Sequence, residues 1–161
     1  MNSASHPLES QSSGPLRVVL VDEHEQELWG LWKLVEGEWP RMIVAGTART
    51  LDVATQLSGS NLVDVIVTDM LPALRSGFNR FSELRRQAGT AIVVLADACN
   101  RDLDRRLLEA GASAVVQKHE PADVLLDQIE RAGRAGSAPE TNRSSQELPE
   151  EPAPISRAKP T

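Results

Sequence analysis

Three acidic residues and one lysine have the side-chain types and positions that phosphate and metal chemistry require. Asp22 and Glu23 are adjacent, Asp69 ends the apolar run at residues 65–68, and Lys118 follows a short apolar segment. If these side chains meet, three carboxylates share one small site, where two like charges about 4 Å apart repel by roughly 4 kcal/mol at an effective dielectric near 20. Such a group needs a cation, and Mg²⁺ is commonly held by one or two carboxylates with water and phosphate oxygens.

A carboxylate in this setting can attack phosphorus and form an aspartyl phosphate, whose charge a divalent cation and a lysine share. Asp69 is the candidate nucleophile, because ligands of parallel sheets gather where the strands end. Lys118 carries a compact charge on a long stem, which suits contact with phosphoryl oxygens. Taken alone, Asp69 also fits a loop cap and Lys118 a solvated lysine, so the prediction depends on their convergence.

The rest of the chain supplies the elements that would position these residues. Uninterrupted apolar runs are typical of strands covered on both faces, and each run here precedes residues with helical spacing. The strand-like segments are 16–21, 42–45, 63–68, 91–96 and 114–116, in which Arg17 and Asp64 are the only charged residues. This alternation predicts an α/β fold, a doubly wound five-stranded parallel sheet with five helices. All strands of such a sheet end at one edge, so the three acids, Asp97 and Lys118 should gather there.

Two local expectations concern the surroundings of the site. Residues 70–76 contain Pro72, so we expect a loop long enough to fold over Asp69. Trp29 and Trp32 are spaced as neighbours on one helical face, and aromatic residues in such positions usually fill a core. We therefore expect both tryptophans to be packing residues.

Composition limits the class of protein. The 161 residues are 40% hydrophobic and 25% charged, enough for one ordinary core, which we place at residues 16–134. Seven of the ten prolines lie in residues 1–15 or 139–161, and we expect disordered tails at 1–15 and 135–161. The formal net charge of -6 argues against nucleic-acid binding. A lone cysteine excludes an internal disulfide, and no apolar run could span a bilayer, so we expect a cytoplasmic protein.

Four stretches resemble the receiver domains of two-component response regulators, most closely receivers that are joined to a helix-turn-helix output domain. They are residues 18–24 (VVLVDEH), 64–69 (DVIVTD), 109–114 (EAGASA) and Lys118, and the likeness covers about residues 16–134. The resemblance implies a flavodoxin-like fold with strand order 2-1-3-4-5. It also implies a bacterial signalling protein rather than an enzyme.

The family pattern implies a part for each site residue. Asp22 and Glu23 would hold Mg²⁺ together with Asp69 and the backbone carbonyl of Leu71. Asp69 would accept phosphate from a histidine kinase or phosphotransfer protein, and Lys118 would contact the phosphoryl group. No helix-turn-helix pattern follows the last expected helix, so we expect no direct nucleic-acid binding. The expected protein is a stand-alone phosphorelay component, a monomer or weak homodimer without membrane binding, that signals to a downstream protein partner.

The readout positions depart from the family pattern. Ala96 stands where the fourth strand usually carries Ser or Thr, so it has no hydroxyl for a phosphoryl oxygen. Asp97 replaces a small residue and would repel a bound phosphate, and Val115 replaces the aromatic switch residue. Pro72 lies one place earlier than the family's usual proline. A receiver with these residues would take phosphate and switch weakly, or would act without phosphorylation.

Three other classes of function share part of this pattern. A pseudo-receiver, a phosphorylation-independent protein interaction module, is the alternative that the departures favour. A phosphohydrolase of similar topology would need an acid two positions after its nucleophile, where Leu71 stands. A cobalamin carrier with an Asp-x-His-x-x-Gly signature begins like Asp22 to His24 but needs glycine where Glu27 stands.

Overall fold

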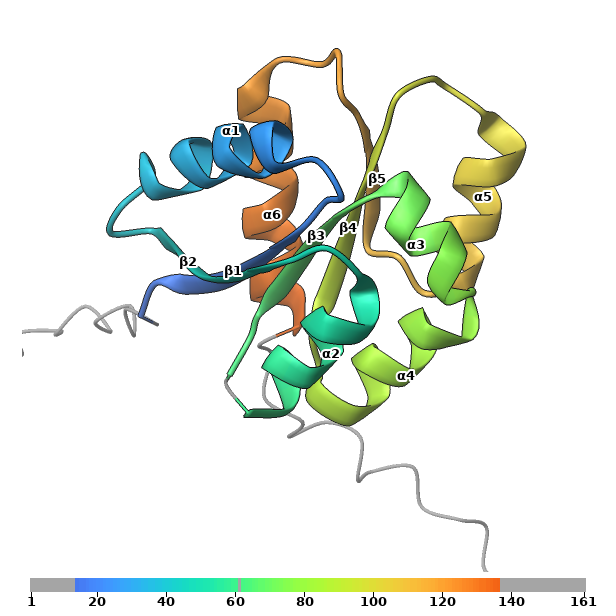
Figure 1. The fold of residues 1–161 in the computed structure, drawn as a ribbon, viewed down its shortest axis with the longest axis horizontal. Helices are drawn as coiled ribbons and strands as arrows, with labels where there is room; N and C mark the ends of the chain where they lie inside the picture. Colours follow the sequence, from blue (N-terminus) through green and yellow to red (C-terminus); the bar gives the residue numbers. More distant parts are fainter. Residues whose placement is uncertain (1–13, 61, 137–161) are drawn as a thin grey trace, which may run out of the picture.

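The structure of the protein, a computed structural model, describes residues 14–60 and 62–136. Its five strands form one parallel sheet in the order β2-β1-β3-β4-β5 (Figure 1). The elements are β1 Leu16–Val21, α1 Glu25–Glu36, β2 Met42–Ala48, α2 Leu51–Ser60, β3 Val65–Asp69, α3 Met70–Ser76, α4 Asn79–Ala88, β4 Ala91–Ala96, α5 Arg101–Ala110, β5 Ala114–Gln117 and α6 Ala122–Gly136. The predicted fold class and strand order are confirmed. The tails expected at 1–15 and 135–161 lie almost wholly outside the described residues.

The burial of each strand follows from its place in the sheet. All residues of β3 and β4 are buried, because helices cover both faces of these central strands. Alternate residues of β3 face opposite layers, so Val65 and Val67 pack with one set of helices and Ile66 packs with the other. The edge strands β2 and β5 are mostly half-buried. The apolar runs that form β3 and β4 thus mark the centre of the fold.

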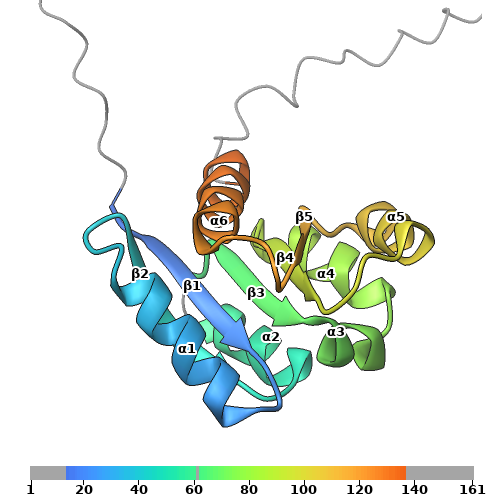
Figure 2. The same ribbon diagram turned by 90° about the horizontal axis from the view of Figure 1, so that it is seen from above.

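Helices form two layers, one on each face of the sheet (Figure 2). The first layer holds α1 and α6, which bury Val35 and Ile129 against the sheet. The second layer holds α2 to α5 and buries Leu51, Phe81 and Leu107 on the other face. Among the described residues, no helix is both long and apolar enough to cross a membrane.

The described part of the chain has six helices where the sequence predicted five, and the additional helix is α3. The expectation of a loop at residues 70–76 is wrong, because these residues form α3 directly after β3. The Asp69 side chain caps this helix by accepting a hydrogen bond from the backbone N–H of Leu71 at 3.1 Å. Pro72 lies in the first turn, where a missing N–H breaks no helical hydrogen bond. Capping and proline together therefore favour a helix here.

The expectation that Trp29 and Trp32 fill the core is wrong. Their exposed fractions are 64% and 40%. The residues of α1 that pack against the sheet are instead Leu28, Leu31 and Leu34, together with the buried Val35. The helix thus carries two apolar stripes, and only the leucine stripe faces the sheet.

The carboxyl ends of four strands bring the candidate residues to one edge. Asp22 directly follows β1, Asp69 is the last residue of β3, Asp97 directly follows β4, and Lys118 directly follows β5. The backbone N–H of Lys118 donates to the carbonyl of Ala96 at 2.8 Å. The lysine is therefore held beside the end of β4.

Candidate functional site

Asp69 is a buried carboxylate at the end of the central strand β3. Asp69 is only 3% exposed, and the two oxygens of its carboxylate have different contacts. Oδ2 accepts the capping hydrogen bond from Leu71. Oδ1 lies 2.6 Å from Nζ of Lys118, in an ion pair without the alignment of a hydrogen bond. The helix cap and the ion pair together fix the carboxylate at the sheet edge.

Lys118 lies among three carboxylates. Its Nζ is 2.6 Å from Oδ1 of Asp69, 2.8 Å from Oε2 of Glu27 and 3.2 Å from Oδ1 of Asp97. Partial burial by itself lowers the pKa of Lys118, but the contacts with Asp69, Glu27 and Asp97 outweigh burial and raise that pKa above its ordinary value. The side chain is therefore a permanent ammonium at neutral pH.

Asp22 is a fully buried carboxyl at the end of β1. Its Oδ1 accepts a hydrogen bond from the backbone N–H of His24 at 2.8 Å, whereas Oδ2 has no hydrogen-bond partner in the described part of the chain. Burial raises the pKa of Asp22, the His24 hydrogen bond opposes this, and the nearby carboxylates of Glu27 and Asp69 raise the pKa further. The Asp22 corner therefore has an excess of negative charge and an oxygen free to bind a cation.

Two members of the expected metal set, Glu23 and the Leu71 carbonyl, make contacts with or within α3. The Glu23 carboxylate forms an ion pair with Arg75 of α3. Leu71 belongs to α3, and a carbonyl in the first turn of a helix points along the helix axis toward its carboxyl end. The structure thus brings Asp22, Asp69 and Lys118 together, while Glu23 pairs with α3 and the Leu71 carbonyl is part of a helix.

Glu27 is a member of the site that sequence reasoning missed. It lies in the first turn of α1, and its hydrogen bond to Lys118 lowers its pKa. A signal for it exists in the sequence, since Glu27, Leu31 and Leu34 follow the i, i+4, i+7 spacing of one helix face. Glu27 lies on the same face of α1 as the leucines that pack on the sheet, one turn closer to the edge where the strands end.

The three positions that depart from the family pattern keep that character in the structure. Ala96 is completely buried at the end of β4 and offers no polar side-chain atom. The Asp97 side chain is 72% exposed, and it reaches Lys118 from the solvent side. Val115 is partly buried on β5 and packs with the apolar cluster of the second helical layer. These positions therefore supply packing and charge rather than a hydroxyl and a ring.

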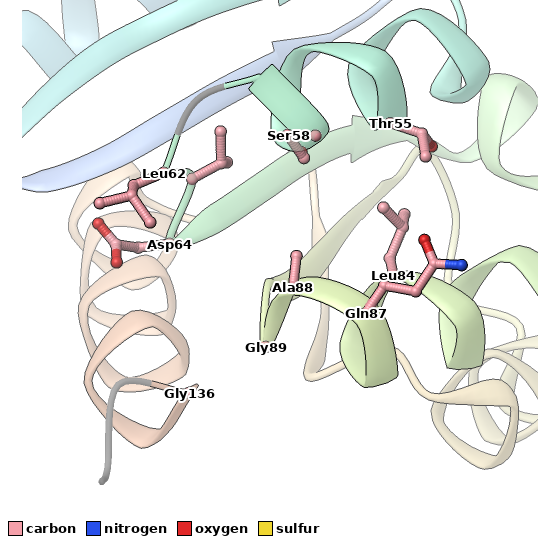
Figure 3. A pocket seen from close by; sticks show the side chains of 11 residues that line it. Thr55, Ser58, Leu62, Asp64, Leu84, Gln87, Ala88, Gly89 and Gly136 are labelled. Atoms are coloured by element: carbon pink, nitrogen blue, oxygen red, sulfur yellow. The ribbon is translucent and has the colours of Figure 1, made fainter.

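Two pockets border the sheet at opposite edges. One of about 470 Å³ lies between α2, α4 and the end of α6, with Asp64, Leu84 and Gln87 in its lining (Figure 3). It lies at the amino ends of the strands, and Asp64 there already accepts a hydrogen bond from the backbone N–H of Arg17. The other, of about 270 Å³, has Glu27 and Lys118 in its lining. We place the functional site at the second edge, because the buried carboxylates of Asp22 and Asp69 lie there.

Comparison with known proteins gives a family match over most of the folded part. The family model described as the response regulator receiver domain matches residues 18–130. None of the curated proteins matches the chain.

Solved structures show the same fold at low identity. The signal receiver domain of the response regulator NarL from Mycobacterium tuberculosis is 18% identical, with a TM-score of 0.69 over 76% of this chain and 98% of that one. The beryllofluoride-activated NtrC4 receiver domain dimer is 23% identical, with a TM-score of 0.65 over 75% and 98%. The response regulator domain of Thermotoga maritima CheB is 21% identical, with a TM-score of 0.65 over 74% and 97%.

Proposed function

The chain belongs to the response regulator receiver domain family, and from this premise we propose that it accepts a phosphoryl group on Asp69. The donor is a histidine kinase or a phosphotransfer protein. The observation that carries the proposal is the ion pair of 2.6 Å between the buried Asp69 and Lys118. It supports phosphoryl transfer because it holds a nucleophile and a phosphate-binding cation at one sheet edge.

The proposed transfer needs one nucleophile and one charge partner from the chain. An Asp69 oxygen attacks the phosphorus of a phosphohistidine, the new P–O bond forms as the P–N bond breaks, and the leaving imidazole takes up a proton. Oδ1 of Asp69 is the candidate atom, because Oδ2 accepts the cap hydrogen bond of α3. Lys118 then binds the phosphoryl oxygens in place of its present contact with Asp69, as charge-assisted hydrogen bonding favours.

The acids of the site fit a hard divalent cation. Asp22 has a buried oxygen without a hydrogen-bond partner among the described residues, and Asp69 is close enough to raise the pKa of Asp22. We propose Asp22, Glu23, Asp69 and the Leu71 carbonyl as the Mg²⁺ ligands. To take part, Glu23 would have to leave Arg75, and the first turn of α3 would have to open at Leu71. Bound Mg²⁺ would supply positive charge that offsets the charge of the phosphoryl oxygens.

The same proposal covers partners and setting. The protein acts in a phosphorelay of a two-component system, in the cytoplasm, as a monomer or weak homodimer that signals to a downstream protein partner. Dimerisation is a property stated for the NtrC4 receiver. The net charge of -6 supports protein contacts rather than direct nucleic-acid binding. We propose a signalling role without membrane binding, and no enzymatic turnover of a substrate.

A second candidate function is a pseudo-receiver that acts as a phosphorylation-independent protein interaction module. The observation that favours it is the contact of Asp97 with Lys118 at 3.2 Å, since a carboxylate there competes with a phosphoryl group for the ammonium. The absence of a hydroxyl on the buried Ala96 points the same way.

Incubation with acetyl phosphate and Mg²⁺, followed by intact-mass measurement, separates the two functions. We expect a gain of one phosphoryl group on the wild-type chain and none on Asp69→Asn. Asp102→Asn is the matched control, because Asp102 is a highly exposed aspartate in α5. If the wild type gains no mass with acetyl phosphate or with a phosphorylated phosphotransfer protein, the interaction module is the better description.

A further inference from the structure

The turn between β1 and α1 groups three potential metal ligands, two of which, His24 and Glu27, lie outside the proposed Mg²⁺ set. One ligand atom from each of Asp22, His24 and Glu27 lies within 4.8 Å of the others. Asp22 ends the strand, His24 precedes the first residue of α1, and Glu27 lies in the first helical turn. A single strand-to-helix corner thus assembles two carboxylates and one imidazole.

The buried Asp22 carboxylate is a group that a bound cation would stabilise. The residue has no solvent exposure, and its Oδ2 has no hydrogen-bond partner within residues 14–60 and 62–136. A buried carboxylate oxygen without a donor is unfavourable. The nearby Glu27 carboxylate repels rather than compensates, and it contributes to the raised pKa of Asp22. A divalent ion between the two acids would remove this repulsion.

His24 is free to act as a ligand. Its side chain is 64% exposed and makes no capping hydrogen bond to α1, although His24 precedes the helix. Its Nδ1 lies 3.1 Å from Oδ1 of Asp22. This contact keeps the imidazole at the corner without burying it.

The distances suit a metal after a small contraction. Three atoms 4.8 Å apart surround a centre about 2.8 Å from each, and zinc binds nitrogen and carboxylate oxygen at about 2.0–2.2 Å. Movement of exposed side chains by less than about 1 Å closes that gap. Water would complete the coordination, since three protein ligands leave a tetrahedral position open.

We propose that Asp22, His24 and Glu27 form a binding site for a divalent transition metal that accepts nitrogen ligands, with Zn²⁺ as its test ion. An imidazole with two carboxylates suits such ions, whereas Mg²⁺ favours oxygen ligands alone. The site differs from the proposed Mg²⁺ set, which uses Glu23, Asp69 and the Leu71 carbonyl. Asp22 is common to both.

Occupation of this site would act on the phosphoacceptor through shared residues, a consequence that rests on the proposed function. Glu27 pairs with Lys118 at 2.8 Å, and a metal that takes Glu27 weakens that pair. Lys118 would then pair more closely with Asp69. Because Asp22 cannot serve two ions fully, the transition metal and Mg²⁺ should compete, and coupling of this kind is reciprocal.

The test is calorimetric titration of the metal-free full chain with Zn²⁺ and, separately, with Mg²⁺. We expect saturable binding of one Zn²⁺, with affinity reduced at least tenfold in His24→Ala and in Glu27→Gln. His119→Ala and Glu25→Gln are matched controls, an exposed histidine after β5 and an exposed acid in the same helical turn. Both should bind Zn²⁺ like the wild type. His24→Ala should remain folded, because its exposed side chain loses only the contact with Asp22.

The Mg²⁺ titrations distinguish this site from the family pattern. His24→Ala should leave Mg²⁺ affinity within twofold of the wild type. Asp69→Asn should lower Zn²⁺ affinity by less than tenfold, because it changes only the pairing of Lys118 with Glu27. Absence of saturable Zn²⁺ binding overturns the proposal. So does an unchanged Zn²⁺ affinity in His24→Ala, or a tenfold loss in Asp69→Asn, which would place the ion among the phosphoacceptor ligands. Failure of the proposed function would appear separately, as a lack of phosphoryl gain on Asp69.

Discussion

At the scale of single residues, the site concentrates charge where stability alone would not. Asp22 is buried with an oxygen that has no hydrogen-bond partner in the described part of the chain, and Asp69 is buried beside Lys118. An incompletely compensated buried charge lowers the free energy of unfolding. Proteins tolerate such costs at functional sites, where stabilising substitutions are therefore easy to find.

The first prediction is that Asp22→Asn stabilises the metal-free protein at neutral pH. Asparagine keeps the acceptor for the backbone N–H of His24 and removes the buried charge. We expect the free energy of unfolding to rise by about 1–2 kcal/mol at pH 7, in the range typical of such stabilising changes. Urea denaturation in the presence of a chelator measures it.

The pH dependence of this difference follows from the raised pKa of Asp22. A carboxyl that holds its proton more tightly in the fold contributes stability below its unfolded value of 3.8, and loses that contribution as pH rises through the native pKa. The advantage of Asp22→Asn should therefore be small near pH 4 and grow toward pH 7. Asp102→Asn, with its exposed side chain, should differ little from the wild type throughout. An advantage that shrinks with rising pH contradicts the assignment.

Sequence reasoning placed Asp22, Asp69 and Lys118 at one edge because parallel strands end together whatever their side-chain details. It missed Glu27, because a helical residue reaches that edge only when the helix is rotated correctly about its axis. It also assigned Glu23 to the metal site, whereas the side chain pairs with Arg75 of α3, an element that was not predicted. Contacts that depend on helices were thus harder to foresee than contacts that depend on strand ends.

At the scale of elements, two differences from the sequence prediction have one physical origin, the competition between local patterns. In α1, one stripe contains Leu28 and Leu31, and a second stripe with the same spacing contains Trp29 and Trp32. Only the leucine stripe packs against the sheet. After β3, the turn signal of Pro72 is outweighed by the capping of α3 by Asp69. Neither outcome is decided by the local pattern alone.

The second prediction contrasts two glycines within helices. A Cβ at Gly133 of α6 would lie 2.8 Å from Cδ2 of Leu16 and 2.9 Å from Cγ2 of Val65, whereas a Cβ at Gly30 of α1 would meet nothing within 4 Å. Val65 is buried and β-branched, so it yields little. We expect Gly133→Ala to lower the free energy of unfolding by about 1 kcal/mol. This is the destabilisation by overpacking, reduced by the higher helix propensity of alanine. Gly30→Ala should raise it by about 0.5–1 kcal/mol.

Chemical denaturation of the two variants side by side checks this contrast. Both substitutions change glycine to alanine inside a helix, so each serves as the control for the other in helix propensity. Shifts in the same direction for both would mean that α6 does not approach β1 and β3 as closely as the structure indicates.

At the scale of the whole molecule, neither a hydroxyl at position 96 nor a ring at position 115 links Asp69 to the outer face of α5 and β5. A switch needs an element with two arrangements that the ligand favours unequally. In receivers with a hydroxyl on the fourth strand and a ring on the fifth, those groups are such an element. Here Ala96 is buried and apolar, and Val115 packs in the apolar cluster of the second layer. The proposed phosphorylation at Asp69 would therefore have little effect on the arrangement of α5 and β5.

The third prediction is that phosphorylation alters the protein only near the sheet edge. We expect hydrogen exchange after treatment with acetyl phosphate and Mg²⁺ to slow at the β1–α1 turn and in α3, because these segments carry the proposed ligands and the helix that Asp69 caps. Residues 101–117, which form α5 and β5, should exchange as before, within about twofold. Asp69→Asn treated identically is the control, and it should show no change anywhere. Slower exchange in α5 that depends on Asp69 would mean that the signal crosses the molecule by side chains other than those at positions 96 and 115.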